Sequence, residues 1–147
     1  MNRKILFRGK CVSDSKFAGE WVTGGYVPLS KKITPNNEEL IMRFLGGNTT
    51  ITYHVDPDTV GQFTGMTDKN GVKIFEGDIV EVYDFTSAYA SKHRGVVKIY
   101  RGSWCVEYDS SIFDTVFRPM LFFDDFADRK TEVIGNIHDN PELLVTK

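Results

Sequence analysis

The chain has 147 residues, of which 41% are hydrophobic, 26% charged and 13% aromatic. This composition is typical of a folded domain and excludes a disordered, collagen-like or low-complexity chain. Eighteen Lys and Arg residues stand against twenty Asp and Glu, a formal net charge of -2, so no overall basic field attracts nucleic acid or an anionic membrane. The length fits one domain with a core large enough to fold without disulfide bonds or metals.

The two cysteines, Cys11 and Cys105, lie far apart and match none of the close spacings of metal or redox sites. We therefore expect two reduced, packed thiols. The residues before Arg8 contain no apolar run long enough for a signal peptide, and no stretch approaches the roughly 20 apolar residues of a membrane-spanning helix. These features predict a cytoplasmic protein without membrane contact.

Short apolar and aromatic runs separated by frequent glycines predict a chain built mainly of strands. Segment 20–29 is expected to form a hairpin around Gly24-Gly25, because paired glycines supply the positive φ angles of a tight turn. Segment 36–45 fits two structures. One is a helix that begins at an Asn and ends at Gly46-Gly47. The other is a strand that pairs with 49–55 across the same glycines.

Strand signals become denser after residue 58. Asn70-Gly71 is the clearest turn and should join residues 62–64 to residues 73–75. A polar loop is expected over 84–94. Alternating apolar and polar residues predict further strands, which we place at 79–83, 95–100, 104–108 and 132–137. Strands joined by tight turns without intervening helices indicate a small antiparallel barrel.

The sequence therefore predicts a mainly β protein with at most one or two short helices. We expect a single domain over 1–147, composed of an N-terminal β extension in 1–58 and a small SH3-like antiparallel barrel in 59–147. Segment 121–126 is a short apolar run that fits a helix or a strand equally well.

No catalytic motif is recognisable in the sequence. Both glycine-rich phosphate-binding motifs and the G-x-S-x-G nucleophile elbow are missing, and the three histidines lack metal-ligand spacing. Asp124, Asp125 and Asp128 could bind a divalent cation or perform acid-base catalysis, but a solvated loop or helix face explains them more simply. We predict a protein that is not an enzyme and has no catalytic residues, resident metal or cofactor.

One loop and the hairpin after it combine basic and aromatic residues. Cations hold phosphates and flat rings stack on bases, so this combination favours binding of single-stranded nucleic acid. The alternative is that the rings point into the core while the charges only solvate the surface. The candidate nucleic-acid-binding residues are Lys92, Arg94, Lys98, Tyr100, Arg101 and Trp104.

Two long motifs resemble the signature of the YopX family, which is found in phages and prophages. The first covers 59–71 and continues through 74–80, and the second covers 132–144. Their order and spacing agree over nearly the whole chain, whereas 29–52 and 109–130 follow no recognised pattern. The shared residues are rich in turn formers, so they mark either the fold or a site. The resemblance implies a mainly β, self-associating protein of mobile elements, without established catalytic residues to transfer.

Taken together, these features predict a phage- or prophage-type accessory protein of unknown biochemical activity. It would act through protein-protein contacts, as a homo-oligomer or with a host or phage protein. High aromatic content and long β edges favour assembly. A nucleic-acid-binding β-barrel protein is the alternative.

Overall fold

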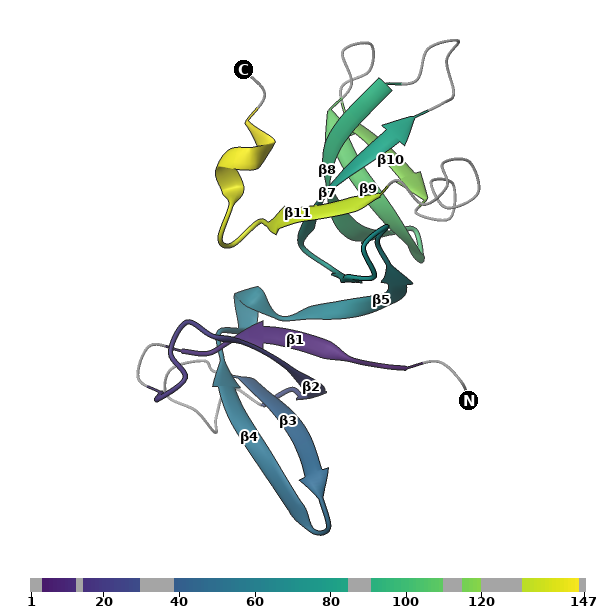
Figure 1. Cartoon of the computed structure of the whole chain (residues 1–147). Coiled ribbons are helices and arrows are strands. Elements are labelled where there is room, and N and C mark those ends of the chain that lie inside the picture. Colours follow the sequence, from purple (N-terminus) through teal and green to yellow (C-terminus); the bar gives the residue numbers. More distant parts are fainter. Residues whose placement is uncertain are drawn as a thin grey trace. The chain divides into compact units, whose positions relative to one another are not determined.

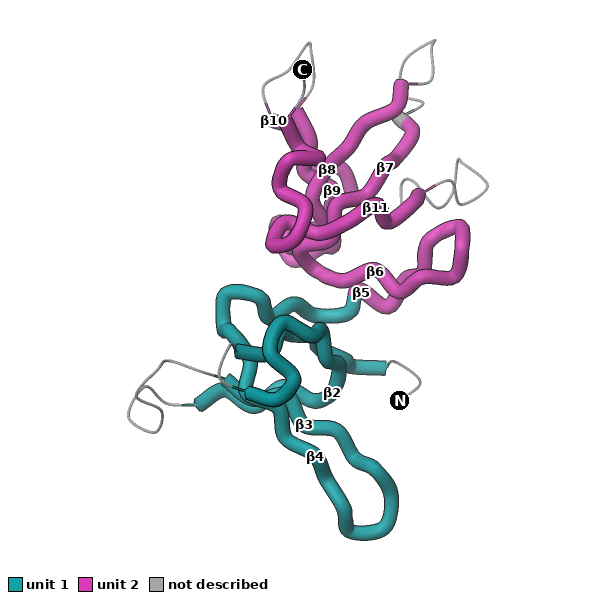
Figure 2. The backbone as a smooth tube through the Cα atoms, turned by 60° about the vertical axis from the view of Figure 1, so that its left-hand side comes forward, with its two compact units in different colours: residues 1–63 teal, residues 64–147 magenta. Residues whose placement is uncertain are grey.

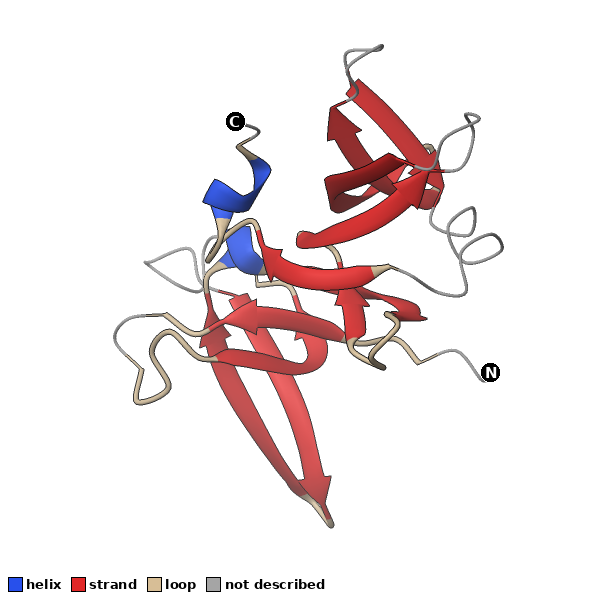
Figure 3. Cartoon of the chain, turned by 45° about the horizontal axis from the view of Figure 1, so that its top comes forward, coloured by secondary structure: helices blue, strands red, loops and turns tan. Residues whose placement is uncertain are grey.

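The computed structural model describes residues 4–12, 15–29, 39–84, 91–109, 115–119 and 131–145. Within these ranges the regular structure consists of antiparallel strands and two short 3₁₀ helices, as Figure 3 shows. The chain divides into two compact units, residues 1–63 and 64–147 (Figure 2). The prediction of a mainly β protein is confirmed.

The first unit is built on an antiparallel sheet with the strand order β4-β3-β2-β1-β5 (Figure 1). Its elements are β1 (Phe7–Lys10), β2 (Trp21–Val27), β3 (Glu39–Gly46), β4 (Thr49–Val55), the 3₁₀ helix η1 (Pro57–Thr59) and the first residues of β5 (Gly61–Thr67). A bridge between Cys11 and Val55 ties the end of β4 to the residues after β1. Both side chains belong to a core with Val22, Ile41 and Tyr53.

The predicted hairpin around Gly24-Gly25 is wrong, because β2 runs through both glycines. Neither glycine has a positive φ angle. A Cβ atom on Gly24 would collide with the backbone carbonyl of Met42 on β3. Glycine is therefore required here because a neighbouring backbone approaches closely, and not because the chain turns.

The strand alternative for segment 36–45 is the one that the structure adopts from residue 39 onward. β3 pairs with β4 along its whole length, and Gly46 and Gly47 close the hairpin with φ angles of 103° and 58°. Residues 36–38 lie outside the described residues. The partner run 49–55 is rich in β-branched and aromatic side chains, which favours a sheet over a helix at this position.

The second unit contains a five-stranded antiparallel sheet with the order β10-β9-β8-β7-β11. Its elements are the end of β5, β6 (Lys73–Phe75), β7 (Asp78–Asp84), β8 (Ser91–Tyr100), β9 (Ser103–Asp109), β10 (Thr115–Pro119), β11 (Glu132–Asn136) and the 3₁₀ helix η2 (Pro141–Leu144). Among the described residues the edge strands β10 and β11 do not pair with each other. The predicted barrel is therefore not closed, and β6 is hydrogen-bonded to β5 instead of joining this sheet.

One face of the five-stranded sheet covers the core of the second unit. Val80 and Val82 of β7 point to this face, as the alternation in the sequence predicted. The core residues are Ile74, Val80, Val82, Val97, Val106 and Tyr108. The predicted polar loop 84–94 is too long, because β7 extends to Asp84 and β8 begins at Ser91. Strand β10 was not predicted, and the ambiguous segment 121–126 lies outside the described residues.

The predicted Asn70-Gly71 turn is confirmed, and a buried carboxylate organises it. Asp68 is only 4% exposed. Its Oδ1 accepts hydrogen bonds from the N–H groups of Asn70 at 2.8 Å and Val72 at 2.9 Å, and its Oδ2 accepts one from Val133 on β11 at 3.0 Å. Burial alone would raise the pKa of Asp68, but the three N–H donors outweigh it and lower the pKa.

Candidate functional site

Four of the six predicted nucleic-acid-binding residues share one face of β8. Side chains alternate along a strand, so Lys92, Arg94, Lys98 and Tyr100 point to the same side. Val97 points to the opposite side, into the core. We call the side with the even-numbered residues 92–100 the outer face of β8.

Each cation of this outer face is paired with a carboxylate on a neighbouring strand. Glu81 of β7 accepts hydrogen bonds from Lys92 Nζ at 2.7 Å and from Arg94 Nε at 3.0 Å. Glu107 of β9 accepts one from Lys98 Nζ at 2.9 Å. Two carboxylates therefore compensate most of the charge of three cations. The sequence could not show this, because the partners are brought together by strand register.

The ion pairs also determine the protonation of Glu81. The hydrogen bond from Lys92 lowers the pKa of Glu81, burial opposes this effect, and Arg94 lowers the pKa further. The same contact raises the pKa of Lys92. Glu81 and Lys92 consequently remain charged at neutral pH, and their ion pair persists there.

The two aromatic residues of the candidate site, Tyr100 and Trp104, lie on opposite faces of the sheet. Trp104 is paired with Ile99 in the strand register, which places it on the core face, where it packs against the hydrophobic core. Tyr100 lies on the outer face, and its ring stacks on Phe117 of β10 with 4.1 Å between centroids. The Arg101 guanidinium lies 5.3 Å from the centroid of the Tyr100 ring. Tyr100 thus lies on the outer face with Arg101 beside its ring, whereas Trp104 does not lie on this face.

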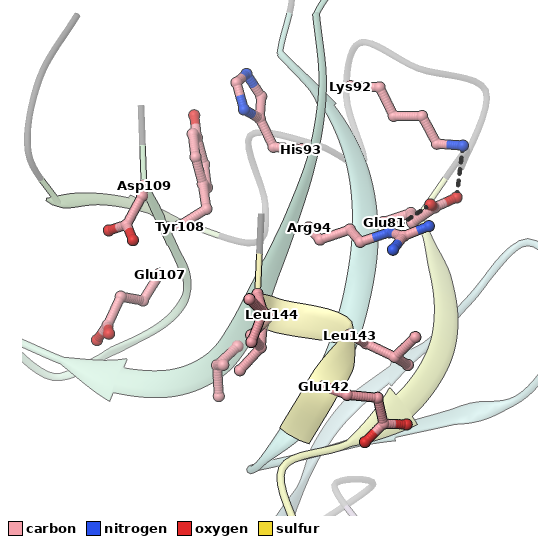
Figure 4. A pocket seen from close by; sticks show the side chains of 12 residues that line it. Glu81, Lys92, His93, Arg94, Glu107, Tyr108, Asp109, Glu142, Leu143 and Leu144 are labelled. Atoms are coloured by element: carbon pink, nitrogen blue, oxygen red, sulfur yellow. Dashed lines mark hydrogen bonds and ion pairs between the residues drawn. The ribbon is translucent and has the colours of Figure 1, made fainter. Parts of the chain in front are cut away.

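A pocket of about 690 Å³ lies over the outer face of β8 where η2 approaches the strand (Figure 4). Its lining comes from β7, β8, β9 and the C-terminal segment: Glu81, Lys92, His93, Arg94, Val96, Glu107, Tyr108, Asp109, Glu142, Leu143, Leu144 and Val145. In Figure 4, Glu107 and Asp109 lie on one side, Glu81 and Arg94 on the other, and Leu144 between them.

The pocket combines apolar surface with an excess of negative charge. Its lining holds two cations and four carboxylates. Among the described residues, neither Asp109 nor Glu142 has a cationic partner; Asp109 accepts only a long hydrogen bond from Thr115, at 3.4 Å. Leu143 and Leu144 are half-buried, and Val145 is 71% exposed. The pocket therefore suits an apolar group that carries a positive charge beside it.

The end of the β3–β4 hairpin is a surface that the sequence analysis missed. Residues 43–50, which we call the arm, are all exposed, and Phe44 and Leu45 at its tip are 68% and 57% exposed. Figure 1 shows the hairpin extending beyond the ends of β1 and β2. Closer to the sheet, Ile41 and Tyr53 are buried in the core. The signal was the Phe-Leu pair before Gly46-Gly47, which belongs to a hairpin tip only in the strand alternative.

The acidic residues Asp124, Asp125 and Asp128 lie outside the described residues. Within the described ranges, no group of three or more His, Cys, Asp or Glu side chains is close enough together to hold a metal ion. Cys11 and Cys105 are free and buried, as predicted, and burial raises the pKa of both thiols. None of the helices in the described part of the chain is long and apolar enough to cross a membrane.

The two sequence motifs quoted above supply turn and strand contacts. Besides Asp68 in the first motif, Asn136 in the second accepts hydrogen bonds through Oδ1 from the N–H groups of His138 and Asp139, each at 3.0 Å. A Cβ atom on Gly135 would lie 2.6 Å from Oδ1 of Asn140. These residues are therefore used to build the fold of the second unit.

Comparison with known proteins identifies the family. A family model described as YopX protein matches residues 13–145. Protein yopX from Bacillus subtilis has a similar solved structure, with a TM-score of 0.50, 18% identity and coverage of 97% of each chain. Protein EF1440 from Enterococcus faecalis is similar at a TM-score of 0.48 and 22% identity, covering 97% of this chain and 99% of its own. No curated protein matches. Because the family model covers most of the sequence, this chain belongs to the YopX family.

Proposed function

We propose that this protein is a non-enzymatic accessory protein of phage or prophage type that works through protein-protein contacts and assembles with further copies of itself. The observation that carries the proposal is the arm, residues 43–50. Both of its alternating faces are exposed, so no core supports it within the described part of the chain. A two-stranded ribbon is at best marginally stable in water.

Exposed apolar residues at the tip strengthen the argument. Two consecutive large apolar residues, Phe44 and Leu45, are exposed there, and exposed apolar surface of this kind marks an interaction site. Most exposed strand edges are protected by charged residues or prolines. Residues 49–53 of the edge strand β4 contain neither. Among the described residues, the edge of β4 is covered near its end, where the carbonyl of His54 accepts a hydrogen bond from the N–H of Val12. A partner that covers the arm would remove both liabilities.

Measuring the mass in solution over a concentration series tests this proposal. We expect the wild-type chain to form a defined oligomer and the double variant Phe44→Ser/Leu45→Ser to shift toward the monomer. Val72→Ser is the matched control, because Val72 is 48% exposed but lies outside the arm. A wild-type chain that stays monomeric at the highest concentration would contradict self-association.

Nucleic-acid binding is the second candidate, carried by the alignment of Lys92, Arg94 and Lys98 on one face of β8 with Arg101 at its end. In this alternative the sheet from β7 to β10 would act as the SH3-like binding surface that the sequence predicted. It ranks second because Glu81 and Glu107 pair with the three cations of the strand. Binding of a single-stranded oligonucleotide that weakens with salt, and weakens further in Arg101→Ala, would favour this candidate.

A further inference from the structure

We propose that the pocket over the outer face of β8 receives the tip of the arm from a second copy of the chain. This inference rests on the proposed self-association and specifies both surfaces of the contact. Phe44 and Leu45 would enter the pocket, and Arg43 would face its carboxylates. The two surfaces belong to different units of the chain, residues 1–63 and 64–147.

The dimensions of the two surfaces agree. The volume of about 690 Å³ lies within the range of about 300–1,000 Å³ that holds drug-sized ligands. The side chains of Phe44 and Leu45 together are smaller than such a ligand, so the pocket has room for both. Residues 43–50 are all exposed, so among the described residues nothing covers Phe44 and Leu45.

The apolar surfaces agree as well. Leu143, Leu144 and Val145 border the pocket, and Val145 is among the most exposed large hydrophobic residues of the described chain. Val96 is buried beneath them on β8. Burial of Phe44 and Leu45 against these residues would remove exposed apolar surface from both copies, which is the main driving force of protein association.

Charge favours the same contact. Arg43 is the one charged residue of the arm, whose sequence is RFLGGNTT. It is exposed, and its contacts with the described residues are weak: a 3.4 Å hydrogen bond from Nε to the carbonyl of Thr23 and a 5.9 Å approach to the Tyr53 ring. Asp109 and Glu142 at the pocket lack a cationic partner among the described residues. An entering Arg43 would supply the missing positive charge.

This contact joins two different surfaces, so each copy offers one arm and one pocket. Such a contact is made twice in a two-fold dimer, in which each arm enters the pocket of the other copy, or it is repeated from copy to copy in a ring or a filament. A copy with a defective arm and a copy with a defective pocket should therefore still form one good contact. That property makes the proposal testable by complementation.

The experiment uses two full-length variants. The first is Phe44→Ser/Leu45→Ser, which lacks the arm tip; the second is Asp109→Lys/Glu142→Lys, which reverses two exposed charges at the pocket. Each variant alone should self-associate at least tenfold more weakly than the wild type. Their equimolar mixture should contain 1:1 heterodimers by native mass spectrometry. Leu144→Asp is a second pocket variant, and circular dichroism verifies that every variant is folded.

The outcomes separate this inference from the proposed function. If the wild type forms an oligomer that only the arm variant weakens, the arm binds at another surface. This result would overturn the assignment of the pocket as the arm's binding site and would leave self-association supported. A monomeric wild type overturns both. A mixture that forms no heterodimer overturns the arm-in-pocket contact.

Cysteine crosslinking provides an independent measurement. Leu45→Cys in one tagged copy and Val145→Cys in a differently tagged copy should form an intermolecular disulfide under mild oxidation. Val72→Cys replaces Leu45→Cys in the control. The native Cys11 and Cys105 are buried, which keeps the background low. Crosslinking no faster than in the control would overturn the inference.

Discussion

The arm and the outer face of β8 differ in whether their side chains have partners within the chain. On β8, each cation has a carboxylate partner and Tyr100 stacks on Phe117. On the arm, Phe44 and Leu45 are exposed at the tip of a hairpin that no core supports within the described residues. The β8 residues were predicted to bind nucleic acid because they are basic or aromatic. The arm is the better candidate for a binding surface, because the described residues leave its large apolar side chains exposed.

The largest expected effect separates the base of the hairpin from its tip. Ile41 at the base is fully buried, so Ile41→Ala should lower the free energy of unfolding of the first unit by about 2–5 kcal/mol. Phe44→Ala at the exposed tip should change it by no more than about 0.5 kcal/mol. Chemical denaturation measures both. A large loss of stability in Phe44→Ala would show that Phe44 is packed within the chain, which would contradict the description of the tip as an unsupported surface.

The next effect contrasts the buried carboxylate of Asp68 with the half-buried, ion-paired carboxylates of Glu81 and Glu107. The folded-state pKa of Asp68 is lowered, so its contribution to stability is present above the unfolded pKa of about 3.9 and is lost as pH falls through the folded value. In the wild type, the Asp68 carboxylate accepts hydrogen bonds from three backbone N–H groups. Asp68→Asn replaces one carboxylate oxygen with an NH₂ group, which is a donor and faces these donors. It should cost about 1–3 kcal/mol at neutral pH.

The same variant should also lose stability less steeply on acidification. Unfolding midpoints between pH 3 and pH 7 measure this slope. Identical slopes in the wild type and Asp68→Asn would exclude Asp68 as the titrating group, whereas Glu81→Gln shows the contribution of an ion-paired carboxylate in the same series.

A smaller effect tests whether ion pairing prevents the outer face of β8 from binding nucleic acid. Glu81→Gln leaves Lys92 and Arg94 without their carboxylate, so affinity for a single-stranded oligonucleotide at low salt should rise by a factor of about two to five, the size of an exposed ion pair. Fluorescence anisotropy provides the measurement. Glu142→Gln is the control, because Glu142 pairs with no cation among the described residues. Equal binding by all three proteins would mean that the outer face does not bind nucleic acid even when it is unpaired.

The smallest effect concerns Lys98. Its ion pair with Glu107 is exposed, and such pairs contribute at most about 1 kcal/mol. Lys98→Ala should therefore leave the unfolding midpoint nearly unchanged at physiological salt. A larger decrease in the unfolding midpoint would indicate that ion pairs on the outer face contribute substantially to stability, as the packed core does.

Features encoded by neighbouring residues could be predicted from the sequence. The Asn70-Gly71 turn depends on residues that adopt left-handed backbone, and Gly71 has a φ angle of 79°. The alternation in 79–83 and 104–108 correctly predicted strands, because successive side chains of a strand point to opposite faces. The family motifs were recognised for the same reason, since they consist of turn residues at fixed spacing.

Features that depend on which strands become neighbours could not be predicted. Gly24 is explained by the close approach of β3, and the division of Tyr100 and Trp104 between two faces follows from the register of β8 and β9. The candidate nucleic-acid-binding residues lie on β8, β9 and the turn between them, but Glu81, the charge partner of Lys92 and Arg94, lies on another strand.

The sequence by itself therefore determined the mainly β class, the Asn70-Gly71 turn, the reduced cysteines and the family, because each depends on local backbone preferences, composition or a fixed linear pattern. Only the tertiary structure decided that the second unit's sheet stays open, that the β8 cations are neutralised, and that Phe44 and Leu45 are exposed. Pairing, register and burial are properties of segments that are distant in the chain, and their energies arise only when the sheets have formed.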